Sequence, residues 1–125
     1  MKFYSRRLIK HEDLNPAERL FGGRLLAWID EEAAIYAACQ LGRKRIVTKS
    51  MSEINFTAPG HLGEVLEFGL HTVAIGETSI TIACAVRDKE SKRKIIAVDN
   101  IVFVCVDEKG KPTAHGLAAA DSLAA

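Results

Sequence analysis

A phenylalanine and two glycines stand directly before a long alanine-rich segment that carries one acidic cluster. The glycines are Gly22 and Gly23, and the cluster begins at Asp30. Two adjacent glycines at a helix start leave backbone N–H groups open to an incoming oxygen. A carboxylate about two helical turns further on could deprotonate a water molecule. Backbone donors together with one carboxylate suit hydrolysis of an activated carbonyl, in which negative charge develops on oxygen.

A long helix is expected to carry these residues. The alanine-rich sequence predicts helix from about residue 23 to residue 40, and Gly42 offers a natural C-terminal stop. Apolar side chains placed at steps of about 100° fall on several sides of this helix, which predicts that it is mostly buried. Small neighbours around Asp30 would let a partner backbone or a ligand approach closely. These neighbours are Ala27, Ala34, Ala37 and Ala38.

The rest of the chain is expected to form strands. A short edge strand is predicted at residues 3–10, and turn chemistry follows at residues 11–20. After the helix, strands are predicted at residues 45–56, 64–74, 79–87 and 95–106, with a charged hairpin tip at residues 88–93. The first of these should contain a bulge, and the last, apolar on both faces, should be central. This order of elements is an α+β layout, in which the sheet must curl about the helix.

Length and composition favour a single domain over residues 1–125, with a short helix or a frayed, flexible tail at residues 113–125. A net charge of +1 gives no electrostatic argument for binding nucleic acid or a membrane surface. No apolar run has the length of a membrane span, and the first residues lack the apolar stretch of a signal peptide. Three widely spaced cysteines predict buried free thiols in a cytoplasmic protein. Four histidines without metal-ligand spacing are expected at the surface or in turns.

Four short motifs, in order along nearly the whole chain, resemble those of a known enzyme family. Asn15, Phe21-Gly22-Gly23 and Asp30 have the spacing Asn, five residues, Phe-Gly-Gly, six residues, Asp. Residues 56–64 resemble the family's Phe-x-x-Pro-x-x-x-Gly-Asp/Glu turn, residues 76–79 its Gly-x-Thr-Ser hairpin, and residues 106–112 its closing Val-Asp-x-x-Gly-Lys-Pro. The family is the acyl-CoA thioesterase branch of the hotdog-fold superfamily. The resemblance implies a curved antiparallel sheet wrapped around one long central helix.

The resemblance also implies a mechanism for an acyl-CoA thioester hydrolase. The backbone N–H groups of Gly22 and Gly23 would hold the thioester carbonyl oxygen, helped by the helix dipole. Asp30 would act as the general base on water, or as the nucleophile. Asn15 would help to position the water or the carbonyl. The products would be a free carboxylic acid and coenzyme A (CoA), with no metal and no separate cofactor.

In this family the site is shared between two protomers, so Asn15 and Asp30 of one site would come from different chains. The resemblance implies a homo-oligomer built from dimers, as a trimer of dimers. Thr78 and Ser79 would contact CoA, and Arg87 and Arg93 in the basic hairpin could reach its phosphates, since clustered cations bind phosphate well.

Each of these residues also has a structural interpretation. Asp30 could be a solvated helix acid, or Glu31 could be the catalytic acid in its place. Asn15 could be a turn or cap residue, and the two glycines a tight junction between loop and helix. Thr78 and Ser79 could simply begin a strand, and the basic hairpin that includes Arg87 and Arg93 could be solvated.

Two other functions remain open on the same fold. One is a hydroxyacyl dehydratase, whose chemistry calls for a His–carboxylate pair that the sequence does not show at the expected turn. The other is a non-catalytic module that binds acyl-CoA for regulation. The chain also departs from the family pattern at Glu18, where glycine is frequent, and at Ala58, where a basic residue often precedes the proline.

Overall fold

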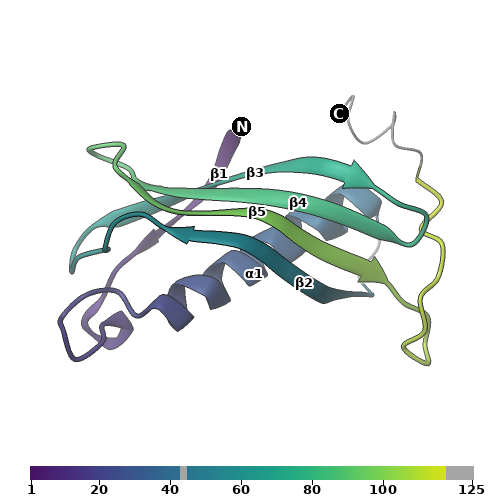
Figure 1. Cartoon of the computed structure of the whole chain (residues 1–125), viewed down its shortest axis with the longest axis horizontal. Helices are drawn as coiled ribbons and strands as arrows, with labels where there is room; N and C mark the ends of the chain where they lie inside the picture. The colour runs from purple at the N-terminus through teal and green to yellow at the C-terminus, as the bar shows by residue number, and fades with distance from the viewer. Residues whose placement is uncertain (43–44, 118–125) are drawn as a thin grey trace.

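A computed structural model describes residues 1–42 and 45–117 of the chain. One long helix lies along the concave face of a curved antiparallel sheet, with strand order β1-β3-β4-β5-β2 (Figure 1). The elements are β1 (Lys2–Leu8), the short 3-10 helix η1 (His11–Asp13), α1 (Gly22–Leu41), β2 (Ile46–Phe56), β3 (Val65–Ile75), β4 (Ser79–Asp88) and β5 (Lys94–Cys105). The predicted α+β layout is confirmed, including the edge strand before the helix.

The ends of α1 follow from its sequence. Gly42 adopts the left-handed conformation with φ of 63°, and its N–H bonds to the Ala38 carbonyl, as the predicted C-terminal stop requires. At the other end the helix begins at Gly22 after Phe21, whose side chain makes no capping hydrogen bond. The N-terminal N–H groups of the helix are thus not covered by a cap of their own.

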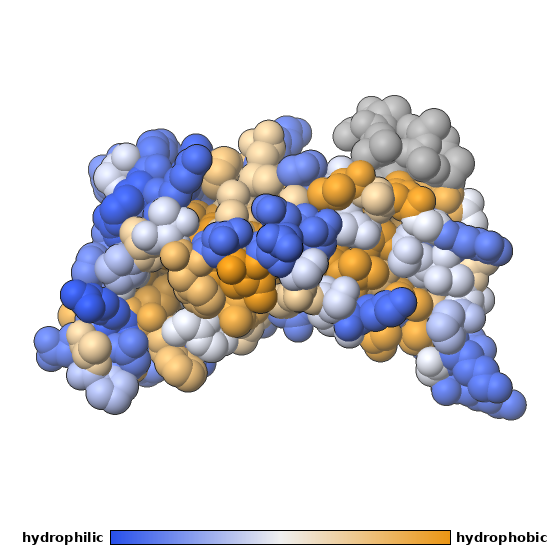
Figure 2. Space-filling model, in the orientation of Figure 1, coloured by the Kyte–Doolittle hydropathy of each residue, from blue (hydrophilic) through white to orange (hydrophobic). Residues whose placement is uncertain are grey.

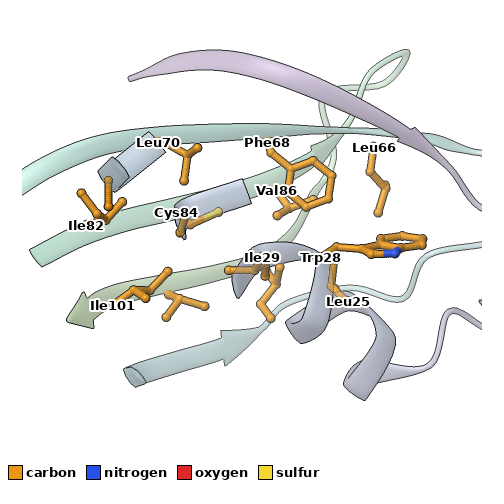
Figure 3. Close-up of a cluster of buried hydrophobic side chains, with 14 of the residues drawn as sticks. Leu25, Trp28, Ile29, Leu66, Phe68, Leu70, Ile82, Cys84, Val86 and Ile101 are labelled. Atoms are coloured by element: carbon orange, nitrogen blue, oxygen red, sulfur yellow. The ribbon is translucent and has the colours of Figure 1, made fainter. Parts of the chain in front are cut away.

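The core lies between one face of α1 and the concave face of the sheet (Figure 3). Helix residues at intervals of three and four point into it, namely Leu25, Trp28, Ile29, Ala33, Ala37 and Leu41. Alternate residues of β3 and β4 meet them, namely Leu66, Phe68, Leu70, Ile80, Ile82, Cys84 and Val86. These two periods, of a helix and of a strand, are the patterns expected for elements that share one core.

The prediction of a mostly buried helix is wrong for the single chain. The sheet covers one side of α1 only, and Ile35 on the other side is 56% exposed. Cys39 is exposed on the same side, so the prediction of three buried thiols holds only for Cys84 and Cys105. Apolar side chains spread round the helix because they face two environments, the core and the outer surface. Figure 2 shows apolar patches between hydrophilic residues on the face of the molecule that is in view.

The strand β2 forms one edge of the sheet, where its ladder partner is β5. The predicted bulge is present as a register shift between Thr48 and Ser50. Strand β5 lies between β4 and β2, which confirms its internal position, while β4 is the middle strand. Val47 and Phe56 on β2 are exposed. A long edge strand with exposed apolar residues is a template for pairing with another chain.

The C-terminal segment is anchored as far as residue 117. The Thr113 N–H donates to the Cys105 carbonyl, and the Leu117 N–H donates to His115 Nδ1. His115 is 5% exposed, with Nε2 at 3.1 Å from the Ser79 carbonyl oxygen. The prediction that this histidine lies at the surface is therefore wrong. Residues 118–125 of the predicted tail lie outside the described part of the chain.

Two isoleucines of α1 test which side of the helix holds the fold together. Ile29 is fully buried and Ile35 is largely exposed. We expect Ile29→Ala to lower the free energy of unfolding by about 2–5 kcal/mol, because it leaves a cavity. Ile35→Ala should change it by no more than about 0.5 kcal/mol. Denaturant unfolding of both variants measures the difference, and equal losses would show that the outer side of α1 is also covered.

Candidate active site

The first turn of α1 presents two backbone donors. The Leu25 N–H already bonds to the Phe21 carbonyl, but the N–H groups of Gly22 and Gly23 have no acceptor among the described residues. Both lie at the positive end of the helix dipole. A Cβ at Gly23 would come within 2.9 Å of the Phe21 ring, so the second glycine lets this ring lie over the helix start. The junction is tight, as the structural interpretation predicted, and it still offers donors to an incoming oxygen.

Asp30 faces the edge strand β2, where it accepts a short hydrogen bond. Thr48 Oγ1 donates to Asp30 Oδ1 at 2.6 Å, just before the bulge of β2. The hydroxyl orients the carboxylate, and Oδ2 has no partner within the part of the chain that the structure describes. Sequence reasoning did not single out Thr48. The available signal was the predicted bulge, because bulges often re-aim a side chain next to a functional site.

The two carboxylates beside Asp30 point to the opposite edge of the sheet. Arg7 Nη2, from β1, donates to Glu31 Oε1 at 2.6 Å and to Glu32 Oε2 at 2.7 Å. Both acids therefore serve the contact between α1 and β1. This engagement argues against Glu31 as the catalytic acid, since its carboxylate is held away from β2.

The donors and the carboxylate of one chain lie about two turns apart on α1. Gly23 and Asp30 are separated by about 10 Å along the helix axis, at a rise of about 1.5 Å per residue. Reacting atoms must approach to roughly 3–3.5 Å. Direct contact between the two sets of groups within one chain is therefore excluded.

Asn15 organises the loop that precedes α1. Its Oδ1 accepts hydrogen bonds from the N–H groups of Ala17 and Arg19, at 2.9 and 3.1 Å. The turn interpretation of Asn15 is thus correct for its carbonyl oxygen, while Nδ2 has no partner among the described residues. In the same loop Glu18 has φ of 62°. Since positive φ favours glycine, this explains why the family pattern often has glycine at that position.

The residues predicted to bind CoA lie at opposite ends of β4. Thr78 and Ser79 are at the turn from β3, where the Thr78 carbonyl accepts the Cys105 N–H at 2.8 Å. Arg87 and Arg93 flank the hairpin at the other end, which is the end at which α1 begins (Figure 1). The strand between Ser79 and Arg87 spans about 26 Å, at roughly 3.3 Å per residue.

The basic hairpin is organised around a buried carboxylate. Glu67 is 4% exposed and contacts three cations: Arg87 at 2.8 Å, Lys92 at 3.0 Å and Arg6 at 3.6 Å. The Arg87 guanidinium also lies 3.6 Å from the centre of the Phe3 ring. Hydrogen bonds from Arg87 and Lys92 lower the pKa of Glu67. Three cations on one carboxylate leave an excess of positive charge at this end of the sheet.

Arg93 holds two turns together. Its Nη2 donates to the Pro59 carbonyl at 3.1 Å and to Glu64 Oε1 at 2.8 Å. Although burial acts to raise the pKa of Glu64, the hydrogen bonds from Arg93 and the His61 N–H lower it overall. Arg93 is therefore a brace of the hairpin end as well as a member of its positive surface.

Neither a reactive buried thiol nor a metal site is indicated among the described residues. Burial raises the pKa of Cys84 to about 12, which keeps this thiol protonated. Among residues 1–42 and 45–117, no group of three or more His, Cys, Asp or Glu side chains is placed to hold a metal ion. In the same part of the chain, α1 is not long and apolar enough to cross a membrane.

Comparison with known proteins identifies the family. A model of the thioesterase superfamily matches residues 18–95, the segment that holds the helix start, Asp30 and Thr48. The chain belongs to this superfamily. The family resemblance predicted from the four motifs is therefore confirmed.

Sequence relatives of this superfamily member are named as acyl-CoA thioester hydrolases. An uncharacterised one from Buchnera aphidicola subsp. Baizongia pistaciae is 32% identical over 117 residues, which are 89% of this chain and 86% of the relative. Another, YkhA from Bacillus subtilis, is 30% identical over 103 residues, or 80% of this chain. The matched part is 59% of the length of YkhA. The prediction of a thioester hydrolase agrees with these names.

Solved structures confirm the predicted hotdog fold. The hexameric thioesterase y2039 from Yersinia pestis has a TM-score of 0.85 and 27% identity, over 94% of this chain and 97% of that one. Cj0915, a hexameric hotdog fold thioesterase of Campylobacter jejuni, has a TM-score of 0.77 and 27% identity, over 88% of this chain and 86% of that one.

The Glu67 cluster predicts an acid-dependent loss of stability. Because the folded state lowers the pKa of Glu67, its contribution is fully present above the ordinary value of 4.5 and is lost as pH falls through the lowered value. We expect Glu67→Gln to be less stable than the wild type at neutral pH, with the difference shrinking in acid. Thermal melting across pH measures it. Glu108→Gln, at an exposed turn residue, is the matched control, and a pH-independent difference would contradict the expectation.

Proposed function

We propose that this chain is an acyl-CoA thioesterase, which hydrolyses acyl-CoA to a free carboxylic acid and CoA. The observation that carries the proposal is the pair of open backbone donors at Gly22 and Gly23 together with an Asp30 carboxylate oriented by Thr48. Donors of this kind stabilise the oxyanion of a tetrahedral intermediate, and a positioned carboxylate removes the proton of a water molecule. The names of the sequence relatives support the same reaction.

In the proposed reaction the carbonyl oxygen accepts hydrogen bonds from the helix start. Asp30 removes a proton from water as the water oxygen attacks the carbonyl carbon. The tetrahedral intermediate then collapses, the carbon–sulfur bond breaks, and the thiolate takes up the proton that Asp30 had accepted. The alternative, direct attack by the Asp30 carboxylate to form an anhydride that water then hydrolyses, uses the same groups.

Each site is proposed to form between two copies of the chain. The gap of about 10 Å between Gly23 and Asp30 along the axis of α1 supports this arrangement, since the two sets of groups of one copy are not in direct contact. The unpaired edge of β2, which carries Thr48, is a surface on which a second copy could pair. We place Asn15 of one chain with Asp30 of the other. The hexameric thioesterases of similar structure support a homo-oligomer, proposed here as a trimer of dimers.

CoA is proposed to lie against the two ends of β4. Thr78 and Ser79 would contact it at one end, and the positive surface around Arg87 and Arg93 would meet its phosphates at the other. Since these ends are about 26 Å apart in one chain, the two contacts would come from different copies. CoA is part of the substrate, and no separate cofactor is proposed. A cytoplasmic location belongs to the same proposal and rests on the free thiols.

The geometry around Asp30 favours hydrolysis over dehydration. A hydroxyacyl dehydratase needs a histidine paired with its carboxylate, whereas Asp30 accepts its hydrogen bond from the Thr48 hydroxyl. The binding-module alternative has no such geometric signature. It is distinguished by the activity experiment below.

The shared site predicts that two inactive variants restore activity to each other. We expect Asn15→Ala and Asp30→Ala each to slow thiol release from acyl-CoA, the second by about a hundredfold or more, because a general base is lost. Co-expression of the two variants should recover about one quarter of wild-type activity, since random pairing leaves that share of sites intact. The control pairs Asp30→Ala with the double variant Asn15→Ala/Asp30→Ala, which leaves no intact site.

Three results would contradict parts of the proposal. Wild-type turnover by Asp30→Ala would exclude it as base or nucleophile. An inactive mixture of variants that still associate would exclude the shared site. If the wild type binds CoA but releases no thiol from any acyl-CoA, the binding-module alternative is correct.

Thr48 is expected to act as a positioning residue for Asp30. Replacing it with valine removes the hydrogen bond without changing the side-chain shape, so kcat should fall about tenfold with KM nearly unchanged. Thr48→Ser keeps the hydroxyl and should retain wild-type kcat. Steady-state thiol release measures both variants. A change in KM without a change in kcat would show that Thr48 does not position Asp30. The same conclusion would follow if Thr48→Ser lost as much kcat as the valine variant.

A further inference from the structure

The turn between β3 and β4 is held by two other segments of the chain. The Thr78 carbonyl accepts the Cys105 N–H at 2.8 Å, from the end of β5. The Glu77 carbonyl accepts the His115 N–H at 3.2 Å, from the segment that follows β5. By contrast, the N–H groups of Glu77 and Thr78 have no hydrogen-bond acceptor within residues 1–42 and 45–117. The carbonyls of the turn are thus engaged inside the fold, whereas these two N–H groups are left for a ligand.

The His115 side chain adds a further contact to this turn. Its Nε2 lies 3.1 Å from the Ser79 carbonyl oxygen, which also accepts the Gly76 N–H at 3.0 Å. Its Nδ1 accepts the Leu117 N–H at 3.0 Å. Because a backbone N–H can only donate and a carbonyl can only accept, the ring is assigned as the neutral tautomer with its proton on Nε2. His115 therefore donates to the turn through Nε2.

The position of His115 is itself fixed by the fold. The side chain is 5% exposed, and two residues earlier the Thr113 N–H donates to the Cys105 carbonyl at 2.9 Å. An aliphatic side chain at this place would also fill the space, but it could not hold the Ser79 carbonyl through a hydrogen bond. A buried imidazole therefore gives the C-terminal segment control over the shape of the turn.

We propose that His115 is a positioning residue, which holds the turn at residues 76–79 in the shape that receives CoA. The inference rests on the proposed function, in which Thr78 and Ser79 contact CoA. CoA carries amide carbonyls and phosphate oxygens, which are acceptors suited to the N–H groups of Glu77 and Thr78. His115 acts on the substrate only through the turn, because both of its ring nitrogens are engaged with the backbone.

A turn that is fixed in advance binds its ligand more tightly. Glu77 is exposed and Thr78 is half-buried, so the turn depends on its backbone hydrogen bonds for its shape. Loss of the bond from Nε2 should let the turn adopt other conformations, which must be given up when CoA binds. The chemical step takes place elsewhere and should be unaffected. The expected signature is a rise in KM with kcat unchanged.

Two replacements of His115 separate the roles of its ring nitrogens. The amide nitrogen of glutamine reaches the place of Nε2 and can donate to Ser79, whereas the amide of asparagine extends only as far as Nδ1. We expect His115→Asn to raise KM for acyl-CoA about fivefold, the effect of one neutral hydrogen bond, with kcat unchanged. His115→Gln should keep the wild-type KM. His71→Asn, the same change at an exposed histidine of β3, is the matched control and should alter neither constant.

A truncated substrate and an exchange measurement test whether the effect acts through the turn. Thioesters of N-acetylcysteamine carry the same acyl group but lack the nucleotide and most of the pantetheine arm. His115→Asn should hydrolyse them with the wild-type kcat/KM, because little remains for the turn to hold. Amide hydrogen exchange, followed by mass spectrometry on a peptide that spans residues 75–80, reports the turn itself. Exchange there should be faster in His115→Asn and unchanged in His115→Gln.

Binding measurements separate this inference from the proposed reaction. If the wild type releases no thiol, but His115→Asn binds CoA more weakly in calorimetry and its turn exchanges faster, the reaction fails and the positioning role stands. If His115→Asn impairs both kinds of thioester equally, or lowers kcat alone, the positioning role is overturned.

Two further outcomes also decide the matter. Faster exchange in the turn without any change in KM or in CoA binding would overturn the inference, because the turn then does not receive CoA. If His115→Asn does not fold, His115→Gln carries the test. Wild-type KM and wild-type exchange in that variant support the inference, and a raised KM overturns it.

Discussion

Packing of a single apolar stripe of α1 against the concave sheet is the constraint on which the rest of the structure depends. Ile29 lies fully buried in that stripe, directly before Asp30 in the chain. Its burial sets the rotation of the helix about its axis. Asp30 is thereby aimed at β2, and the two following acids are aimed at Arg7 on β1. One hydrophobic contact thus directs three neighbouring carboxylates to opposite edges of the sheet, Asp30 to β2 and the two following acids to β1.

The same packing places the helix start at the positively charged end of the sheet. There the donors of Gly22 and Gly23, the cations around Glu67 and an apolar pocket that borders Gly22 lie within one end of the molecule. Open backbone donors, apolar walls and positive charge are thus gathered in one region. Asp30 lies further along the helix, and Thr78 and Ser79 lie beyond it. A rigid helix and a rigid strand cannot shorten these separations within one chain.

Sequence periodicity predicted the elements well because it reports local geometry. Gly42 as the helix stop, the bulge of β2 and the alternation of Phe68 with its neighbours were all visible in the chain. The enclosure of α1 was overestimated, since alanines and scattered apolar residues do not reveal which side a sheet covers. Cys39 and His115 were placed wrongly for the same reason. Exposure depends on packing partners that are distant in the sequence.

The order of elements, the start and end of the helix, and the family of this chain were determined by the sequence itself, because each depends on residues close together or on motifs at set spacings. Only the tertiary structure decided that Thr48 holds Asp30, that Arg7 holds its neighbours, and that Ala58 lines a pocket beside Gly22. These contacts join segments far apart in the chain. They arise from the register of the strands and the rotation of the helix, which no local pattern specifies.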